Sequence, residues 1–383
     1  MVILFWASLL LVFYAYAGYP MLLWVIARFK QQGKQEGPAE QDVYSPAVTL
    51  VISAYNEEAV IEQKILNSLA LNYPRNLLEI VVVSDGSRDR TDEIVDRYAW
   101  LRVFLKRFEG RIGKTACLNR TLPFVSGEIV VFSDANSQYD RNAVRVLVRH
   151  FIDPTVGFVT GSTRYIQDGE SGMADSIGIY TRIEQITKRL ESGLSSCVGA
   201  DGALFAVRRS LIPELRSVDI NDLVIPLNIV KGGLRGVFEH RAFCVERTSP
   251  VPGGEFGRQV RITSRTIRAL VHYWELFNPI RFGMFSFQLF SHKVCKLIVP
   301  FLLLFLLGSN AMLLARGPVY AVIFSAQIVL YLLSLQDRTG ARGLGLQRLV
   351  PMIHAFVTVN AAILQGWLKY LQGETYTVWK TAR

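Results

Sequence analysis

The strongest constraint on this chain is the uneven distribution of its charges. Met1 to Ala27 contains no Asp, Glu, Lys or Arg, and the first charge is Arg28. A helix of about 20 apolar residues can cross a bilayer. A cleaved signal peptide is the alternative, but it would have a positively charged start and a shorter apolar core. We therefore predict a retained N-terminal transmembrane anchor over residues 1–28.

Three further apolar stretches lie late in the chain, and nothing comparable occurs between Arg28 and Lys296. The late stretches are Leu297 to Leu314, Pro318 to Leu335 and about Leu349 to Leu368. A water-soluble middle part is therefore expected between membrane segments. The predicted order is a linker (29–46), a soluble domain (47–268), an interfacial amphipathic segment (269–292), three membrane segments (293–371) and a tail (372–383). The aromatic-rich interfacial segment could instead be a core helix of the domain.

Basic residues flank these segments and predict their orientation. The positive-inside rule places the middle domain in the cytoplasm and the N-terminus outside. The tail "LQGETYTVWKTAR" is then expected outside, although it ends in Lys380 and Arg383. Because of that conflict, one of the late segments could instead be re-entrant or interfacial. The residues that set the orientation are Arg28, Lys30, Lys34, Arg281, Lys293, Lys296, Arg338, Arg342 and Arg348.

The net charge of +10 could indicate nucleic acid, but juxtamembrane Lys and Arg facing anionic lipid explain much of it. We therefore expect no nucleic-acid partner, and a phosphate-rich substrate could use the remaining charge. The cysteines show no CxxC or paired spacing, so neither a zinc site nor a disulfide framework is expected. They are Cys117, Cys197, Cys244 and Cys295.

Apolar runs alternate with helical patterns from Ala47 onward. The expected strands are "AVTLVIS", "LEIVVVS", "LRVFLKR", "EIVVFSD" and "VGFVTGS", and the expected helices cover 55–71, 90–99, 114–125 and 141–151. Such alternation predicts an α/β domain with a mostly parallel sheet and helices on both faces. Continuous apolar runs, as found here, are typical of strands buried on both sides.

Two of these strands end on an aspartate, Asp85 in "VVVSDGS" and Asp134 in "VFSDANS". In open α/β sheets ligands bind at the carboxyl ends of the strands. Aspartates that cap loops are common, but two at one edge favour a binding site. Asp134 and Asn136 could bind Mg2+ together with substrate phosphates, because this ion takes oxygen ligands and few carboxylates.

Other motifs carry weaker signals. "GRIGKT" lacks the spacing of a nucleotide-binding P-loop, although Lys114 at a helix start could meet a phosphate. Asp222 precedes an amphipathic run and could be a general base or a helix N-cap. Four arginines form a basic helical stripe that could face lipid or clamp a pyrophosphate; they are Arg258, Arg261, Arg265 and Arg268.

Taken in order, the motifs resemble those of membrane-embedded family 2 glycosyltransferases, which include hyaluronan, chitin, cellulose and poly-N-acetylglucosamine synthases and exopolysaccharide enzymes. The resemblance covers about Ala47 to Arg268 and implies a GT-A (nucleotide-diphospho-sugar transferase) fold flanked by transmembrane helices. Its motifs are "VISAYNEEAVIEQKILNSL", "VVVSDGSRDRT", "GKTACLN", "VFSDANSQYD", "GADGALFAVRR", "INDLVIPL" and "EFGRQVRI".

The resemblance also implies roles for single residues. The donor nucleotide would be contacted by Ala54, Tyr55, Glu57, Asp85, Lys114 and Asp134, with Asp85 at the base. Asp134 and Asn136 would hold Mg2+ or Mn2+ and the donor diphosphate. Asp222 would be the base that activates the acceptor, and Arg258 and Arg261 would lie near acceptor and diphosphate.

The chain departs from the family pattern at four positions. Asn136 replaces the second aspartate of the metal motif, and Asn221 replaces the acidic residue before Asp222. In the motif that begins at Arg258, arginine replaces glutamine and Ile262 replaces tryptophan, so Arg261 alone matches. The missing tryptophan weakens the expectation of processive chain synthesis.

The sequence thus predicts an inverting membrane-bound glycosyltransferase of the plasma (inner) membrane, multi-pass, with a cytoplasmic catalytic domain. It would move a sugar from a nucleotide-sugar, expected to be UDP-linked, to a glycan or lipid-linked acceptor in surface-polysaccharide synthesis, with export components as possible partners. Transfer to polyprenyl phosphate is an alternative. A non-catalytic component of a polysaccharide complex is another, and a transporter is disfavoured because the interiors of the spans carry no charge.

Overall fold

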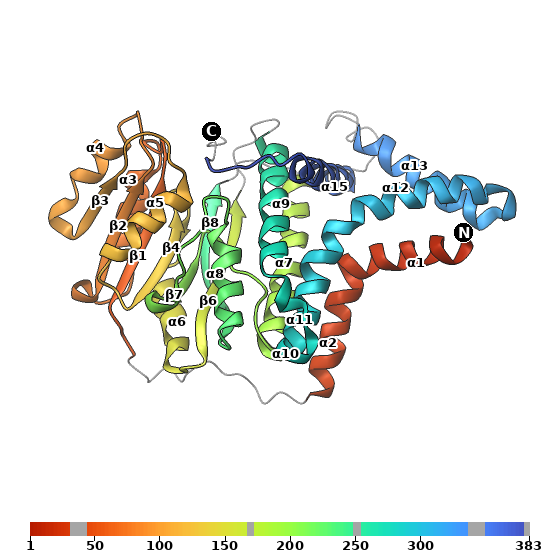
Figure 1. Ribbon diagram of the computed structural model, residues 1–383. Helices are drawn as coiled ribbons and strands as arrows, with labels where there is room; N and C mark the ends of the chain where they lie inside the picture. The colour runs from red at the N-terminus through yellow and green to blue at the C-terminus, as the bar shows by residue number, and fades with distance from the viewer. Residues whose placement is uncertain (31–43, 167–171, 248–253, 336–348, 379–383) are drawn as a thin grey trace.

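The computed structural model describes residues 1–30, 44–166, 172–247, 254–335 and 349–378 (Figure 1). Within them the strands form one sheet in the order β3-β2-β1-β4-β7-β6-β8-β5. The strands are β1 (Val48–Ala54), β2 (Leu78–Ser84), β3 (Val103–Arg107), β4 (Ile129–Asp134), β5 (Gln138–Tyr139), β6 (Val156–Ile166), β7 (Phe205–Arg208) and β8 (Arg235–Arg247).

The helices of the sheet domain are α3 (Ile61–Leu69), α4 (Thr91–Asp96), α5 (Lys114–Thr121), α6 (Ala143–Val148), α7 (Gly172–Leu194), α8 (Asn221–Lys231) and α9 (Gly254–His272). The others are α1 (Val2–Phe13), α2 (Tyr19–Phe29), α10 (Pro279–Phe282), α11 (Met284–Leu289), α12 (Cys295–Leu313), α13 (Pro318–Ser334) and α15 (Leu349–Leu371).

The α/β fold class is confirmed, and all five predicted strands form, as β1, β2, β3, β4 and β6. The half β3-β2-β1-β4 is parallel. The other half is mixed: β7 runs antiparallel to β4 and β6, and β5 runs antiparallel to β8. The expectation of a mostly parallel sheet therefore holds for the first half only. The four residues of β7 are too few to give a periodic signal in the sequence.

Helices cover both faces of the sheet because neighbouring residues of a strand point to opposite sides. In β1, Leu50 and Ile52 pack into a core shared with α3, α4 and α6. Val51 between them packs into a second core with α5, α8 and α9. All seven residues of β1 are buried, which explains why its sequence is a continuous apolar run.

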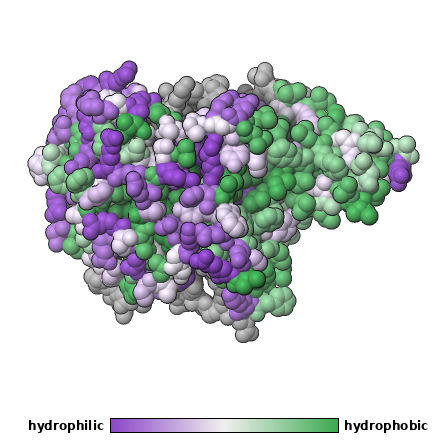
Figure 2. Space-filling model, viewed as in Figure 1, coloured by the Kyte–Doolittle hydropathy of each residue, from purple (hydrophilic) through white to green (hydrophobic). Residues whose placement is uncertain are grey.

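Of the described helices, three are long and apolar enough to cross a membrane: Val2–Phe29, Met284–Arg316 and Leu349–Leu371. The fourth predicted segment forms α13, whose 17 residues span about 25 Å, near the lower limit for a membrane span. Figure 1 shows α1, α12 and α13 projecting together from the sheet domain. Figure 2 shows that the surface of this projection is mainly hydrophobic.

Helix α15 lies across the base of this projection and packs along α9. At Gly366 the two helices are so close that a Cβ would lie 2.6 Å from the Thr263 Cβ. Helix α15 also makes hydrogen bonds to the end of α13, to the π-helical turn that follows α1 (Tyr14–Gly18) and to the start of α12. The pairs are His354 with the Ser334 carbonyl (2.9 Å), Asn360 with the Tyr16 hydroxyl (3.1 Å) and Trp367 with the Leu297 carbonyl (3.0 Å).

The C-terminal tail lies on the same side of the projection as the sheet domain. Arg268 of α9 donates a hydrogen bond to the Glu374 carbonyl (2.8 Å), and the Thr377 carbonyl lies against Gly113 of the domain. Residues 372–378 thus lie beside the sheet domain, which favours the re-entrant or interfacial late segment that the sequence left open. On which side of a membrane the tail lies remains a prediction.

Several predicted features remain predictions. The domain boundary at 268 falls inside α9, and the boundary at 292 falls inside a π-helical turn, Phe290–Val294. The interfacial segment buries Leu276 and Phe285 but exposes Trp274 and Ile280, so one side packs on the core and the other is open. Most of the linker 29–46 lies outside the described residues, as do Arg338, Arg342, Arg348, Lys380 and Arg383.

We expect Gly366→Ala to destabilise the protein, because overpacking of a tight contact costs about 1–3 kcal/mol. The added methyl group would meet the Thr263 side chain and the Val260 carbonyl. Thermal unfolding of the purified protein in detergent measures the effect. Gly308→Ala is the control, because nothing lies within 4 Å of its Cβ position; equal melting temperatures of the two variants would contradict the close packing of α15 on α9.

We also expect the tail to be labelled from the same side of the membrane as the sheet domain. Gly373→Cys and Arg88→Cys should react with a membrane-impermeant maleimide in the same vesicle orientation, and Arg316→Cys in the opposite one. The background is low because the four native cysteines are buried. Labelling of residue 373 together with residue 316 would show that α15 crosses the bilayer.

Candidate active site

The register of the parallel strands brings three strand ends together. Ala54 of β1 lies beside Ser84 of β2, and Ser53 lies beside Asp134 of β4. The loops that begin here share the carboxyl edge of the sheet, where ligands bind in folds of this kind. The structure therefore brings the ends of β1, β2 and β4 to a single edge.

The loop after β1 is tied to the loop after β2. The Asn56 amide donates to Ser87 Oγ (3.1 Å), and the Glu57 amide donates to Thr91 Oγ1 (2.8 Å). Asn56 has a left-handed φ of 52°, which asparagine adopts more readily than most residues. These bonds keep the segment around Tyr55 out of a helix, so α3 begins later than predicted. The role of Asn56 was missed, although it lies inside the quoted motif.

Asp85 is fully buried directly after β2. Its carboxylate accepts hydrogen bonds from the amides of Ile112 (2.8 Å) and Gly113 (3.0 Å) and from the Cys117 thiol (3.3 Å). These bonds hold the loop that leads into α5. Gly113 has a φ of 94°, a region that favours glycine. The predicted contact of Asp85 with a nucleobase remains a prediction.

Ala54 and Tyr55 shape the edge beside Asp85. The Ala54 carbonyl accepts a hydrogen bond from the Asp85 amide (3.1 Å). The Tyr55 ring is covered by the Arg111 guanidinium, whose central carbon lies 3.5 Å from the ring centroid. A flat pair of this kind, a cation over an aromatic face, is itself attractive and forms a planar surface next to the loop held by Asp85.

Lys114 and Asp134 form a direct ion pair. Lys114 begins α5, and its Nζ lies 2.6 Å from Asp134 Oδ1. The Asp134 side chain is 40% exposed, so a ligand can still reach it. Asn136 follows in the same loop, half-buried, and its side chain makes no hydrogen bond to a described residue.

Asp134 and Asn136 offer one carboxylate and one amide oxygen. Among the described residues no group of three or more His, Cys, Asp and Glu could hold a metal by itself. Divalent cations with few protein ligands complete their shell with substrate phosphates and water. The residues present therefore fit a cation that binds together with a diphosphate.

A buried lysine of α3 contacts the loop between β4 and β5, which contains Asn136. Lys64 of α3 is fully buried; its Nζ donates to the Ser137 carbonyl (2.5 Å) and lies 3.7 Å from the centroid of the Tyr139 ring. Burial lowers the pKa of Lys64 to about 7. The helical pattern of α3 gave no signal for this role, because a lysine on a helix is usually solvent-exposed.

Asp222 lies in the first turn of α8, after Ile220, and makes no capping hydrogen bond. Gly202 leaves room for its carboxylate, since a Cβ there would lie 2.7 Å from Oδ2. Burial raises the pKa of Asp222, and the charge of Lys114 opposes this while that of Asp134 adds to it. Asp134 and Asp222 therefore converge around Lys114. The alternative role of Asp222 as a helix N-cap is wrong.

Two acidic residues that the sequence did not single out lie in the same place. Asp201 accepts hydrogen bonds from the Thr163 amide (2.8 Å) and hydroxyl (2.9 Å) and interacts electrostatically with Asp222. Glu246 of β8 accepts from Ser137 Oγ (2.5 Å). Burial, and next the charge of Asp134, raise the pKa of Glu246 to about 6. Asp201 lies in the "GADG" motif, but nothing in the sequence marks Glu246.

The arginines of α9 face the domain and the tail, so a lipid-facing stripe is excluded for at least two of them. Arg265 donates to the Val218 carbonyl (2.8 Å) and to Thr115 Oγ1 (3.1 Å), and Arg268 binds the tail. Arg258 pairs with Glu255 at the start of the helix. Arg261 makes no hydrogen bond to a described residue, and burial, followed by the charge of Arg258, lowers its pKa.

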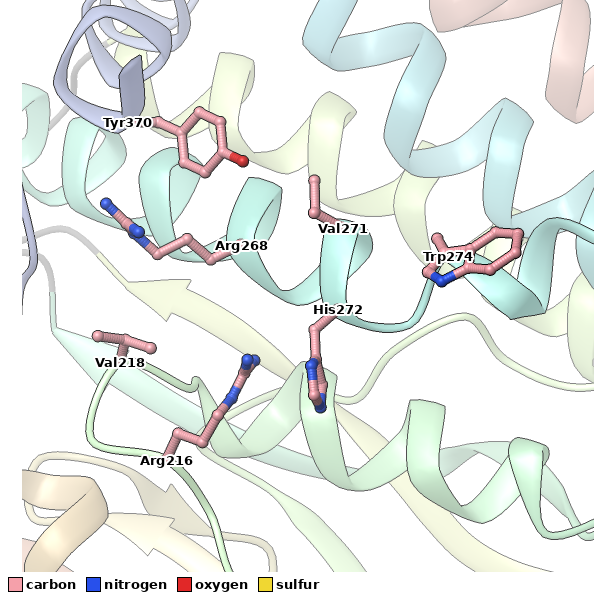
Figure 3. A pocket seen from close by; sticks show the side chains of 7 residues that line it. All are labelled: Arg216, Val218, Arg268, Val271, His272, Trp274 and Tyr370. Atoms are coloured by element: carbon pink, nitrogen blue, oxygen red, sulfur yellow. The ribbon is translucent and has the colours of Figure 1, made fainter. Parts of the chain in front are cut away.

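A cavity of about 460 Å³ lies on another face of α9 (Figure 3). Its lining is cationic and aromatic, and of the residues considered for the site in the sequence only Arg268 of the arginine stripe belongs to it. The lining residues are Arg216, Val218, Arg268, Val271, His272, Trp274 and Tyr370. Two of its cations are already engaged, Arg216 with Asp219 (2.7 Å) and Arg268 with the tail. The converging acids and lysine therefore mark the better candidate for chemistry.

The model of the family described as Glycosyl transferase family 2 matches residues 49–216. The chain carries a family 2 glycosyltransferase domain. It is 32% identical over 181 residues to the Probable glycosyltransferase YdaM of Bacillus subtilis (strain 168), covering 45% of this chain and 43% of the relative. It is 27% identical over 223 residues to the Poly-beta-1,6-N-acetyl-D-glucosamine synthase of Staphylococcus aureus (strain COL), covering 56% and 53%. It thus spans about half the length of these relatives.

Among solved structures, the chain is similar over nearly its whole length to the mannosyltransferase PcManGT from Pyrobaculum calidifontis in complex with GDP-Man and Mn2+. The TM-score is 0.71 at 25% identity, and the match covers 97% of this chain and 99% of that chain. This likeness confirms the GT-A fold of the family 2 domain and extends to the flanking helices.

We expect Glu246→Gln to stabilise the protein at pH 8 and to have little effect at pH 4.5. In the folded protein the pKa of Glu246 is raised to about 6, so the protonated carboxyl stabilises the fold at low pH. This stabilisation, about 1–2 kcal/mol, is lost as the pH rises through 6. Thermal unfolding at both pH values measures the difference. Glu214→Gln, at an exposed position, is the control; a pH-independent gain would contradict the raised pKa.

Proposed function

We propose that this chain is an inverting membrane-bound glycosyltransferase that moves a sugar from a nucleotide-sugar to a glycan or lipid-linked acceptor in surface-polysaccharide synthesis. The observation that carries the proposal is the convergence of Lys114, Asp134 and Asp222 at the carboxyl edge of the sheet. Inverting transfer needs a group that neutralises the leaving diphosphate and a base for the incoming hydroxyl, and these residues provide both kinds of group.

In the proposed reaction Asp222 takes the proton of the acceptor hydroxyl as its oxygen bonds to the anomeric carbon. The bond from that carbon to the diphosphate oxygen breaks at the same time, and the nucleoside diphosphate leaves with the electron pair. Lys114 and Arg261 stabilise its developing charge. A bound Mg2+ or Mn2+, held by Asp134 and Asn136, would supply further neutralisation of the diphosphate.

The donor is proposed to be a UDP-sugar, as the resemblance of the motifs implies. The similar structure of PcManGT holds GDP-Man and Mn2+, so GDP-mannose belongs in any test beside the UDP-sugars.

The projecting apolar helices support a membrane location. We propose the inner membrane, with the family 2 domain in the cytoplasm where nucleotide-sugars are made.

The test is release of nucleoside diphosphate by the purified full chain with Mg2+ or Mn2+ and a panel of UDP- and GDP-sugars. We expect release with at least one donor, and a loss of about 100-fold or more for Asp222→Asn, the range for removal of a general base. Asp96→Asn, the same change at an exposed position, should retain activity. No release with any donor, from folded protein, would favour the non-catalytic alternative.

The pH dependence offers an independent test of the base. Because burial raises the pKa of Asp222, kcat/KM should rise with pH along an acid limb that lies above the ordinary range for aspartate. Initial rates across pH with the active donor measure this limb. A flat profile down to the ordinary pKa of aspartate would exclude Asp222 as the titrating base.

A further inference from the structure

A lysine from the base of the membrane projection reaches the loop at Gly199, which packs on the first turn of α8, where the proposed base Asp222 lies. Lys293 lies in the π-helical turn Phe290–Val294 that immediately precedes α12. Its Nζ lies 3.9 Å from the position of a Cβ on Gly199, and the Asp222 carbonyl lies 3.5 Å from that position. Single π-helical turns are frequent at functional sites, and this one joins the apolar helices to the candidate active site.

The Lys293 ammonium has no direct partner among the described residues: no hydrogen bond and no ion pair involves it. The acid that attracts it most, Glu184 of α7, is already bound by His292 (3.0 Å) and by Lys296 (3.2 Å). Lys293 and Asp222 also attract each other electrostatically, but they form no ion pair. The Lys293 ammonium therefore lies close to the proposed base without being bound to it.

A second lysine faces the same place from α7. Lys188 interacts electrostatically with Lys293 and with Asp201, the acid beside Asp222. Its ammonium likewise makes no hydrogen bond or ion pair with a described residue. Glu184 and Asp201 attract Lys188, whereas Lys188 and Lys293 repel each other. A bound anion would offset the repulsion between the two ammonium groups.

We propose that Lys293 and Lys188 bind the phosphate of a lipid-linked acceptor beside Asp222. The inference rests on the proposed function, for which it names the chemical class of the acceptor. Phosphate suits the site because it offers several strong acceptor oxygens to two ammonium groups. An acceptor held here by its phosphate lies next to the group that would activate it.

A lipid source for the phosphate follows from the position of Lys293. Phe290 in the same turn is 49% exposed, and Ile298 and Phe301 on the next turns are 37% and 42% exposed. Ile298 and Phe301 belong to α12, one of the helices of the projection whose visible surface is mainly hydrophobic in Figure 2. A long hydrocarbon chain can therefore lie on these side chains while its phosphate reaches the lysines. A free phosphate would contact only the two lysines and none of these apolar side chains.

The experiment measures equilibrium binding without any donor, by the full chain in nanodiscs of phosphatidylcholine. The probes are a long-chain polyprenyl phosphate, the matching polyprenol and inorganic phosphate. We expect polyprenyl phosphate to bind about tenfold or more tightly than polyprenol, because one charge-assisted hydrogen bond is worth about that factor. Lys293→Gln should remove most of this preference, and Lys188→Gln should reduce it.

Lys293→Arg should retain the preference, because it keeps the charge. Lys231→Gln is the matched control: it removes one charge from a lysine paired with Glu275 (2.5 Å) and should change nothing. Equal binding of polyprenyl phosphate and polyprenol, or a preference that survives Lys293→Gln together with Lys188→Gln, would overturn the proposal. If millimolar inorganic phosphate displaced the polyprenyl phosphate, the inference that the bound phosphate belongs to a lipid would be overturned.

Because binding is measured without donor, failure of sugar transfer does not affect this result. Conversely, efficient transfer to a neutral glycan with no phosphate preference would leave the proposed function intact and exclude the lysine site. Should Lys293 only compensate the charge of Asp222, its replacement would shift the pH profile of transfer and leave the binding ratio unchanged. That outcome, too, would exclude phosphate binding.

Discussion

Gathering carboxylates at one edge of a sheet is possible only where cations neutralise them, and the candidate active site is arranged around this requirement. The charge of Asp134 adds to the burial that raises the pKa of Asp222, as like charges do. Lys114 pairs directly with Asp134 and opposes the rise in the pKa of Asp222, so a single ammonium interacts with both carboxylates. Its position depends on Asp85, whose buried carboxylate fixes Gly113, the residue before the lysine. The buried carboxylate of Asp85 therefore helps to determine where the charges of the candidate site meet.

A second set of buried polar groups fixes the membrane projection relative to this site. The Tyr19 hydroxyl of α2 donates to Glu191 of α7 (2.6 Å), and His292 bonds to the same carboxylate (2.7 Å). Buried polar groups are costly unless they are paired, so these bonds resist any sliding of α2, α7 and the turn before α12. That turn also carries Lys293, and the network thereby sets the distance between the apolar helices and Asp222. The geometry of the proposed phosphate site at this boundary therefore depends on this packing.

A feature of the fold or of the candidate site is predictable from the sequence when residues close together in the chain determine it. The parallel half of the sheet was predictable because strands buried on both faces are continuous apolar runs, and the strand ends at Asp85 and Asp134 follow from them. Glu246 was not predictable, because it reaches the site only through the pairing of β8 with β5 and β6, far apart in sequence. The direction of α15 was not predictable either. Its composition equals that of a span, and only contacts such as Gly366 on α9 turn it across the base.

Glu246 also gives a physical account of the departure at position 136. In the family pattern a second carboxylate follows Asp134, whereas this chain has Asn136 there. The space around Asp134 already contains Asp201, Asp222 and Glu246, and the pKa of Glu246 is raised in part by Asp134. A further carboxylate would strengthen this repulsion and raise the pKa of Glu246 further. An amide supplies a ligand oxygen without adding charge. Glu246 of β8, which accepts a hydrogen bond from Ser137 Oγ (2.5 Å), thus brings a carboxyl group near Asp134, although this chain has an amide where the family pattern has the second carboxylate.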